Sequence, residues 1–159
     1  MNQKLNSLLL SVAMLLLSGC EDLRFHSFHS LYDEWAATDT LQFSYVNTSR
    51  ADDSQMLDVE LRLEPSFPMR ELWLGVQCVN GAAVSFDTVR CEIFDSTGRQ
   101  NGTGVGVLYQ ITHPVGVVDV APGDTVLIKV VHLMDASVRG VTDVGVKVCG
   151  RGQRQFSGN

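Results

Sequence analysis

Apolar and polar residues alternate along much of the chain, which is the pattern of a β-strand with one buried face. The clearest case is the segment 57–64, in which four aliphatic residues alternate with four charged ones. A helix with 3.6 residues per turn would not place all four aliphatic side chains on one face. The pattern therefore predicts a half-buried strand whose charges point to solvent.

Seven further segments have a similar pattern, and turn-forming residues such as Pro122-Gly123-Asp124 lie between them. These segments are 39–46, 72–78, 89–93, 105–111, 115–120, 126–134 and 144–148. Segment 126–134 is apolar on both faces, which indicates a central strand. About eight strands without a helical pattern predict an all-β fold, namely an antiparallel, jelly-roll-like β-sandwich.

The first 19 residues have the pattern of a secretory signal peptide. A short start with one cation, Lys4, precedes an apolar stretch from Leu8 to Leu17, which is shorter than a membrane span of ~20 residues. The stretch ends in Leu17-Ser18-Gly19-Cys20, which resembles the bacterial lipobox. This resemblance implies that residues 1–19 are removed and that the Cys20 thiol becomes lipidated. Two or three acyl chains there make a stable membrane anchor.

The remaining chain divides into a body and two ends that lack clear periodicity. We expect residues 20–37 to be the lipidated Cys20 and a spacer, with a helical turn near Tyr32–Trp35. Residues 38–149 form the β-sandwich domain, and residues 150–159 form a flexible tail.

Charge and composition exclude some classes of protein. The chain has 159 residues, with 12 Lys and Arg against 18 Asp and Glu, for a net charge of −6. Nucleic acid is not an expected partner, because phosphate binding needs clustered cations.

Three cysteines remain after Cys20 in an oxidising compartment. Cys78 and Cys91 fall at inward positions of neighbouring predicted strands and could form a disulfide. The interpretation that we favour is that they are buried thiols that pack as small apolar groups, and Cys149 is left over in either case.

No motif indicates catalysis, a metal or a cofactor. His26 and His29 would need a helical turn and a further ligand to bind a metal, and no such ligand pattern is present. Gly102, Gly104 and Gly106 lack the spacing of a phosphate-binding loop. We expect these alternate glycines to clear one strand face so that an aromatic ring or another stretch of backbone can approach closely. We predict that the protein is no enzyme and has no small-molecule substrate.

Several Asp-Ser/Thr pairs resemble the acceptor motif for O-glycosylation of exported proteins in the Bacteroidota. Thr40 and Ser96, in predicted exposed turns, are the candidate acceptors. Ordinary turn chemistry explains the same pairs, so both interpretations stay open.

Two blocks of sequence are characteristic. The first contains Asp87-Thr88-Val89, Phe94-Asp95 and the Gly-x-Gly-x-Gly run at 102–106. The second is the run 140–148, Gly-Val-Thr-Asp-Val-Gly-Val-Lys-Val. Both blocks resemble the GldH family of gliding-motility-associated lipoproteins of the Bacteroidota. A Trp-Leu-Gly that is common in the family is replaced by Gln100-Asn101-Gly102. The resemblance implies an envelope lipoprotein associated with gliding motility and type IX secretion, without catalytic residues.

The residues after Cys20 also predict which membrane carries the protein. The acidic pair Glu21-Asp22 after Cys20 resembles the surface-export signal of Bacteroidota lipoproteins and departs from the enterobacterial inner-membrane signal. We therefore expect the outer membrane, with the side that the protein faces left open. The expected partners are the membrane and envelope proteins of the motility or secretion machinery.

An alternative function is carbohydrate binding, because jelly rolls commonly bind sugars. The hypothesis requires that Trp35, Trp73 and Tyr109 lie exposed together in a concavity.

Overall fold

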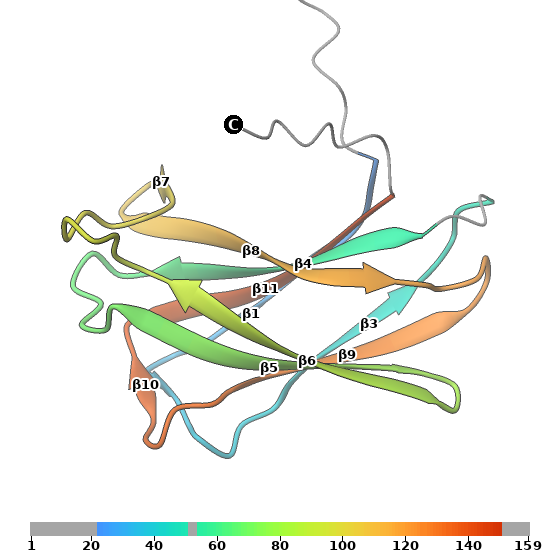
Figure 1. Cartoon of the computed structure of the whole chain (residues 1–159), viewed down its shortest axis with the longest axis horizontal. Coiled ribbons are helices and arrows are strands. Elements are labelled where there is room, and N and C mark those ends of the chain that lie inside the picture. The colour runs from blue at the N-terminus through green and yellow to red at the C-terminus, as the bar shows by residue number, and fades with distance from the viewer. Residues whose placement is uncertain (1–21, 51–53, 151–159) are drawn as a thin grey trace, which may run out of the picture.

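A computed structural model describes residues 22–50 and 54–150, and these residues form two antiparallel sheets that lie one over the other (Figure 1). The antiparallel sandwich predicted from the sequence is confirmed, with eleven strands in the described part of the chain rather than about eight. The described residues include no helix that could cross a bilayer.

The larger sheet has five strands in the order β1-β11-β4-β8-β7. Their bounds are β1 Leu23–Ser30, β11 Val141–Gly150, β4 Gln55–Leu63, β8 Leu108–Val118 and β7 Thr103–Val105. The strand nearest the amino terminus therefore pairs with the last strand, with Leu23 opposite Cys149.

The smaller sheet has four strands in the order β3-β9-β5-β6. Their bounds are β3 Leu41–Val46, β9 Thr125–His132, β5 Glu71–Asn80 and β6 Ala83–Glu92. A short ribbon of β2 (Glu34–Trp35) and β10 (Val138–Arg139) lies beside the two sheets.

The core lies between the inner faces of the two sheets. Aliphatic side chains of β4 and β11 meet those of β5 and β9, and most of them are fully buried. Strand β9 is central in its sheet, as its doubly apolar pattern predicted. Burial of such side chains, at ~1.5–3 kcal/mol for each, supplies the main stabilisation of the fold.

The alternation in β4 is real, but its charges do not point to open solvent. Asp58 and Glu60 are only 3% and 4% exposed, since β4 is a central strand whose outer face is covered by neighbouring side chains. The prediction of a solvent-facing row of charges is therefore wrong for these two residues.

The expected spacer at 20–37 is corrected by the structure. Residues 23–30 form β1, which pairs with β11 along its whole length, and residues 34–35 form β2 instead of a helical turn. Trp35 is fully buried, with its ring edge-on to His132 and its indole N–H donated to the Asp39 carbonyl at 3.2 Å. Within the described residues, strand structure therefore begins at Leu23, directly after Asp22.

The glycine-rich segment is a hairpin rather than one strand. Gly106, with φ of 63°, turns the chain between β7 and β8, and Gly102 has φ of 98°. A Cβ at Gly104 would meet no atom within 4 Å. The expectation of a close aromatic ring is therefore wrong for Gly104, which faces open space, and for Gly106, which is needed for the turn. The expected close approach of another backbone does occur at Gly102, where a Cβ would collide with the Gln110 carbonyl of β8.

Candidate functional site

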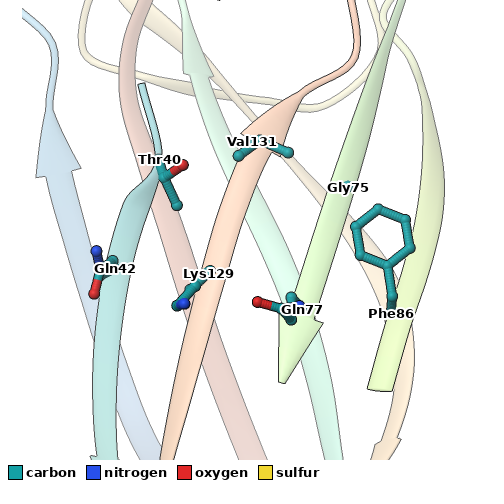
Figure 2. Close-up of a pocket in the computed structure, with 7 residues that line it drawn as sticks. All are labelled: Thr40, Gln42, Gly75, Gln77, Phe86, Lys129 and Val131. Atoms are coloured by element: carbon teal, nitrogen blue, oxygen red, sulfur yellow. The ribbon is translucent and has the colours of Figure 1, made fainter. Parts of the chain in front are cut away.

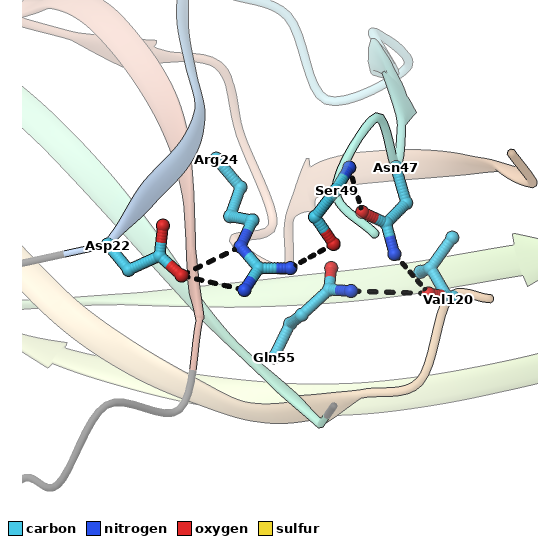
Figure 3. Close-up of polar contacts among 6 residues, drawn as sticks. All are labelled: Asp22, Arg24, Asn47, Ser49, Gln55 and Val120. Atoms are coloured by element: carbon cyan, nitrogen blue, oxygen red, sulfur yellow. Dashed lines mark hydrogen bonds and ion pairs between the residues drawn. The ribbon is translucent and has the colours of Figure 1, made fainter. Parts of the chain in front are cut away.

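One end of the sandwich holds the segment that follows Cys20. Asp22 forms an ion pair with Arg24, with 2.6 Å between its carboxylate oxygen and the guanidinium nitrogen. Arg24 also donates a hydrogen bond to the Ser49 hydroxyl (Figure 3). The backbone N–H of Gly150 donates to the Asp22 carbonyl at 2.8 Å. Although Asp22 is exposed, the Arg24 side chain is only 8% exposed, so these contacts attach the segment firmly to the body.

Buried amides reinforce the same end of the molecule. The side chains of Asn47 and Gln55 both donate to the Val120 carbonyl, at 2.6 and 3.2 Å (Figure 3). Asn47 also accepts from the Ser49 backbone N–H at 3.0 Å. The β3–β4 and β8–β9 connections are thus held together where the chain enters β1.

The predicted lipidation residue, Cys20, and the signal peptide 1–19 lie outside the described residues, as do residues 151–159 of the predicted tail. Only Glu21 stands between Cys20 and Asp22. Two residue steps span at most ~7 Å, even when fully extended. A lipid on Cys20 would therefore hold this end of the sandwich close to the bilayer.

The outer face of the larger sheet is covered by its own side chains. The Phe28 ring lies over Gly145, where a Cβ would be 2.6 Å from Phe28 Cδ1. His26 Nε2 lies 2.6 Å from Glu60 Oε2, and the Thr112 hydroxyl donates to Glu60 Oε1 at 3.2 Å.

Arg62 completes this cover. Its guanidinium carbon lies 3.9 Å from the centre of the Phe28 ring, a cation–π arrangement, and its Nε donates to Gln110 at 3.1 Å. The polar groups of this face are therefore engaged with one another, which leaves little for a ligand to bind.

The outer face of the smaller sheet has a groove with a volume of about 310 Å³ (Figure 2). All four strands, with the residue before β3, contribute to its lining, which consists of Thr40, Gln42, Gly75, Gln77, Phe86, Lys129 and Val131. Nothing in the linear sequence indicated this groove, because the register of four strands brings its residues together.

The two candidate disulfide cysteines are far apart. Cys78 lies opposite Ser85 and Cys91 lies opposite Leu72, so six residues of strand, or ~20 Å, separate them. A disulfide requires Cα atoms within ~7 Å, so this pairing is wrong. Both side chains carry free thiols, and burial raises the pKa of each, that of Cys91 to about 12.

The histidines are distributed over different environments. His26 and His29 lie on opposite faces of β1, and His29 Nε2 donates a hydrogen bond to the Gln42 carbonyl at 2.8 Å. His132 is buried against the Trp35 carbonyl. Within residues 22–50 and 54–150, no three His, Cys, Asp or Glu side chains converge as metal ligands would.

The two candidate glycosylation residues are both exposed. Ser96 lies in a turn closed by a Gly98-to-Asp95 backbone hydrogen bond of 3.1 Å. Thr40 lies at the rim of the groove on the smaller sheet. Accessibility is compatible with modification, which stays a prediction.

The aromatic platform required by the carbohydrate hypothesis is absent. Trp35 is fully buried, and Trp73 and Tyr109 lie in different sheets. Trp73 is 37% exposed, and its indole N–H is already donated to Glu71 at 3.1 Å.

The described residues define an all-β, sandwich-like domain whose first strand, β1, starts three residues after a candidate lipidation cysteine. The chain belongs to the GldH lipoprotein family, whose model matches residues 24–148. The resemblance found in the sequence is thereby confirmed. The family is one of gliding-motility-associated lipoproteins, which implies association with the cell envelope, and it is not a known enzyme family.

A search of curated proteins found no match. Among solved structures, the chain is similar to a family GH115 4-O-methyl-α-glucuronidase with specificity for decorated arabinogalactans (20% identity, TM-score 0.40, 71% of this chain, 14% of that one). It is also similar to the Eiger TNF of S. frugiperda (5% identity, TM-score 0.38, 85% of this chain, 97% of that one). A third similar structure is dimeric latent PorU from Porphyromonas gingivalis (9% identity, TM-score 0.33, 84% and 13%). The chain spans only a small part of the first and third of these proteins, and likenesses this low carry no argument about function.

Proposed function

We propose that this protein is an outer-membrane lipoprotein, anchored through Cys20, that acts by protein contacts within the gliding-motility and type IX secretion machinery. Family membership supports the lipoprotein assignment and the association with gliding. The lipobox-like run Leu17–Cys20 supports the anchor. The role is non-catalytic, and it needs neither a cofactor nor a small-molecule substrate.

The observation that carries the proposal is the attachment of Asp22 to the body. Because Asp22 is held by Arg24 and Gly150, an anchor at Cys20 gives the sandwich almost no freedom to move away from the membrane. A rigid body on so short a tether presents its sheet faces at a defined height, which suits stable contact with membrane-bound partners.

The experiment compares the full-length protein with Cys20→Ala in the native host. We expect radiolabelled palmitate to enter the first protein and not the second, and Cys20→Ala to move from the membrane to the soluble fraction. Cys78→Ala is the matched control, because it removes a different thiol and should keep the label. A Cys20→Ala protein that stays labelled and membrane-bound contradicts the anchor.

Crosslinking of intact cells tests the partners. We expect motility or secretion subunits to co-purify with the anchored protein and to be lost with Cys20→Ala. Recovery of the protein alone under both conditions contradicts a role in that machinery.

A further inference from the structure

We propose that the groove on the outer face of the smaller sheet is a binding site for an acidic saccharide, a pyranose chain that carries carboxylates. This site is independent of the anchor and of the partners proposed above. It also differs from the Trp35–Trp73–Tyr109 platform, which the structure does not form.

The groove is built on one row of residues that crosses the whole sheet. Gln42 lies opposite Lys129, Lys129 lies opposite Gln77, and Gln77 lies opposite Phe86. Figure 2 shows these four side chains side by side, one from each strand. The row thus places two amides and one ammonium group beside an aromatic ring.

The floor of the groove lies at Gly75, which has no side chain. A Cβ at Gly75 would lie 2.8 Å from Phe86 Cζ, so the ring leans over this glycine. Phe86 is nevertheless 58% exposed. The Phe86 ring thus contacts the sheet at Gly75 and is open to solvent elsewhere. The apolar face of a sugar ring can stack on such an aromatic surface.

The polar groups of the groove are available to a ligand. Within the part of the chain that the structure describes, the side chains of Gln42, Gln77 and Lys129 make no hydrogen bond or ion pair with another residue. A glutamine amide both donates and accepts, which matches the hydroxyl groups of a sugar. On the outer face of the larger sheet, by contrast, the polar side chains are already bonded to one another, as His26 and Thr112 are to Glu60.

The charge of the groove selects an anion. Lys129 is the one ionisable residue among the seven that line it, so no carboxylate of the lining neutralises its ammonium group. Lys129 stands between the two glutamines, where it can pair with a carboxylate while the amides bind flanking hydroxyls. A neutral sugar would leave this pairing unused.

An extended peptide is a poorer occupant of this position. Peptides that bind sheets do so mainly through backbone hydrogen bonds at an edge strand. The middle of the groove lies over β9 and β5, which are both paired on two sides. A ligand must therefore be bound by side chains, as sugars are.

The test measures binding of hexagalacturonate to the detergent-solubilised full-length chain by titration calorimetry at about 50 mM salt, where screening is weak. The chain is produced in a host without the O-glycosylation pathway, so that no glycan on Thr40 occupies the groove. We expect saturable binding, with Lys129→Gln weakening it about tenfold and Phe86→Ala about fivefold. Maltohexaose, which is neutral, should bind at least about tenfold more weakly.

Matched variants separate the groove from general effects. Arg99→Gln removes one charge at an 82% exposed side chain, and Tyr32→Ala removes an exposed ring, both away from the groove. Each should leave the affinity for hexagalacturonate within about twofold of the unmodified protein. Circular dichroism shows whether each variant is folded, and Lys129→Met serves if Lys129→Gln is not.

Three results would overturn the proposal. The first is no saturable binding of hexagalacturonate at millimolar concentration. The second is equal binding by Lys129→Gln and the unmodified protein, or by neutral and acidic sugars. The third is equal binding of hexaglutamate peptide, which would show that the groove responds to negative charge alone.

Discussion

At the scale of single residues, Gly145 determines how side chains cover the outer face of the larger sheet. Gly145 leaves room for the Phe28 ring, and Arg62 then lies over that ring. Glu60 is buried beneath the same cover, with His26 and Thr112 as its partners. One glycine therefore allows a buried carboxylate to exist on an outer face.

Gly145→Ala is expected to destabilise the protein by ~1–3 kcal/mol, since the new Cβ displaces the Phe28 ring. Chemical denaturation measures the change in the free energy of unfolding. Gly104→Ala is the control, because a Cβ there meets no atom within 4 Å, and its expected effect is within about 0.5 kcal/mol. Equal stability of the two variants would show that the ring moves aside without cost.

The thiols of Cys78 and Cys91 are expected to stay unmodified when the native protein meets an alkylating reagent near neutral pH. Burial raises the pKa of both groups, so little thiolate is present and the reagent has no access. Mass spectrometry should find both modified only after unfolding. Detection of a peptide that links Cys78 to Cys91 in the native protein would contradict the register of β5 and β6.

At the scale of elements, the sequence pattern predicted strands well where one face is apolar. In β4 the aliphatic residues mark the inner face without ambiguity. Strand β1 was missed because its two faces mix aromatic and polar residues. Phe25 packs on Tyr45 from one face, while His26 and Phe28 cover the other.

The candidate sites were less predictable than the strands, for a physical reason. The groove joins Gln42, Gln77 and Lys129, which are distant in sequence and meet only through the register of β3, β9 and β5. Alternation assigns a residue to a face but does not set its partner on the next strand. Because alternation gives the face of a residue and not its cross-strand partner, it places Cys78 and Cys91 correctly on inner faces but cannot show that they are too far apart to pair.

The turn that contains Ser96 depends on the charge of one carboxylate. Asp95 accepts from the Thr97 hydroxyl at 2.6 Å and from the backbone N–H groups of Thr97 and Arg99. The Thr97 hydroxyl, followed by the backbone hydrogen bond from Arg99, lowers the pKa of Asp95 to about 2.

Asp95→Ala is expected to lower the melting temperature at neutral pH, because these hydrogen bonds are lost. A pKa lowered in the folded state stabilises the fold above the unfolded value of about 4, and this contribution disappears as the pH falls toward 2. The difference in melting temperature between the unmodified protein and Asp95→Ala should therefore shrink between pH 4 and pH 2. Asp33→Ala, at an exposed carboxylate outside the turn, is the control and should show no comparable change.

At the scale of the whole molecule, an anchor at Cys20 would orient the sandwich. The tethered end carries Asp22 and the β3–β4 connection, and the opposite end carries the turn at Val107. Strand β4 runs between these ends over nine residues, which is ~30 Å.

Fluorescent labels at the two ends test this orientation in lipid vesicles. Thr48→Cys and Val107→Cys each place a label at an exposed position, and the buried native thiols should not compete. Energy transfer to a headgroup acceptor is expected to be much stronger from position 48 than from position 107. A flexible Gly-Ser insertion after Cys20 should reduce this difference, and equal transfer from both positions in the uninserted protein would contradict the orientation.

The pairing of β1 with β11 has a consequence for biogenesis. A polypeptide exported amino terminus first would deliver β1 earliest, yet that strand finds its hydrogen-bonding neighbour only when residues 141–150 arrive. Until then its backbone groups and the Phe28 ring are not covered by β11, and an anchor at Cys20 would keep them next to the bilayer. Folding would thus be completed at the amino-terminal end, although that end is exported first. If translocation stopped before residue 141, a lipid on Cys20 would be in the membrane while β1 still lacked its partner strand.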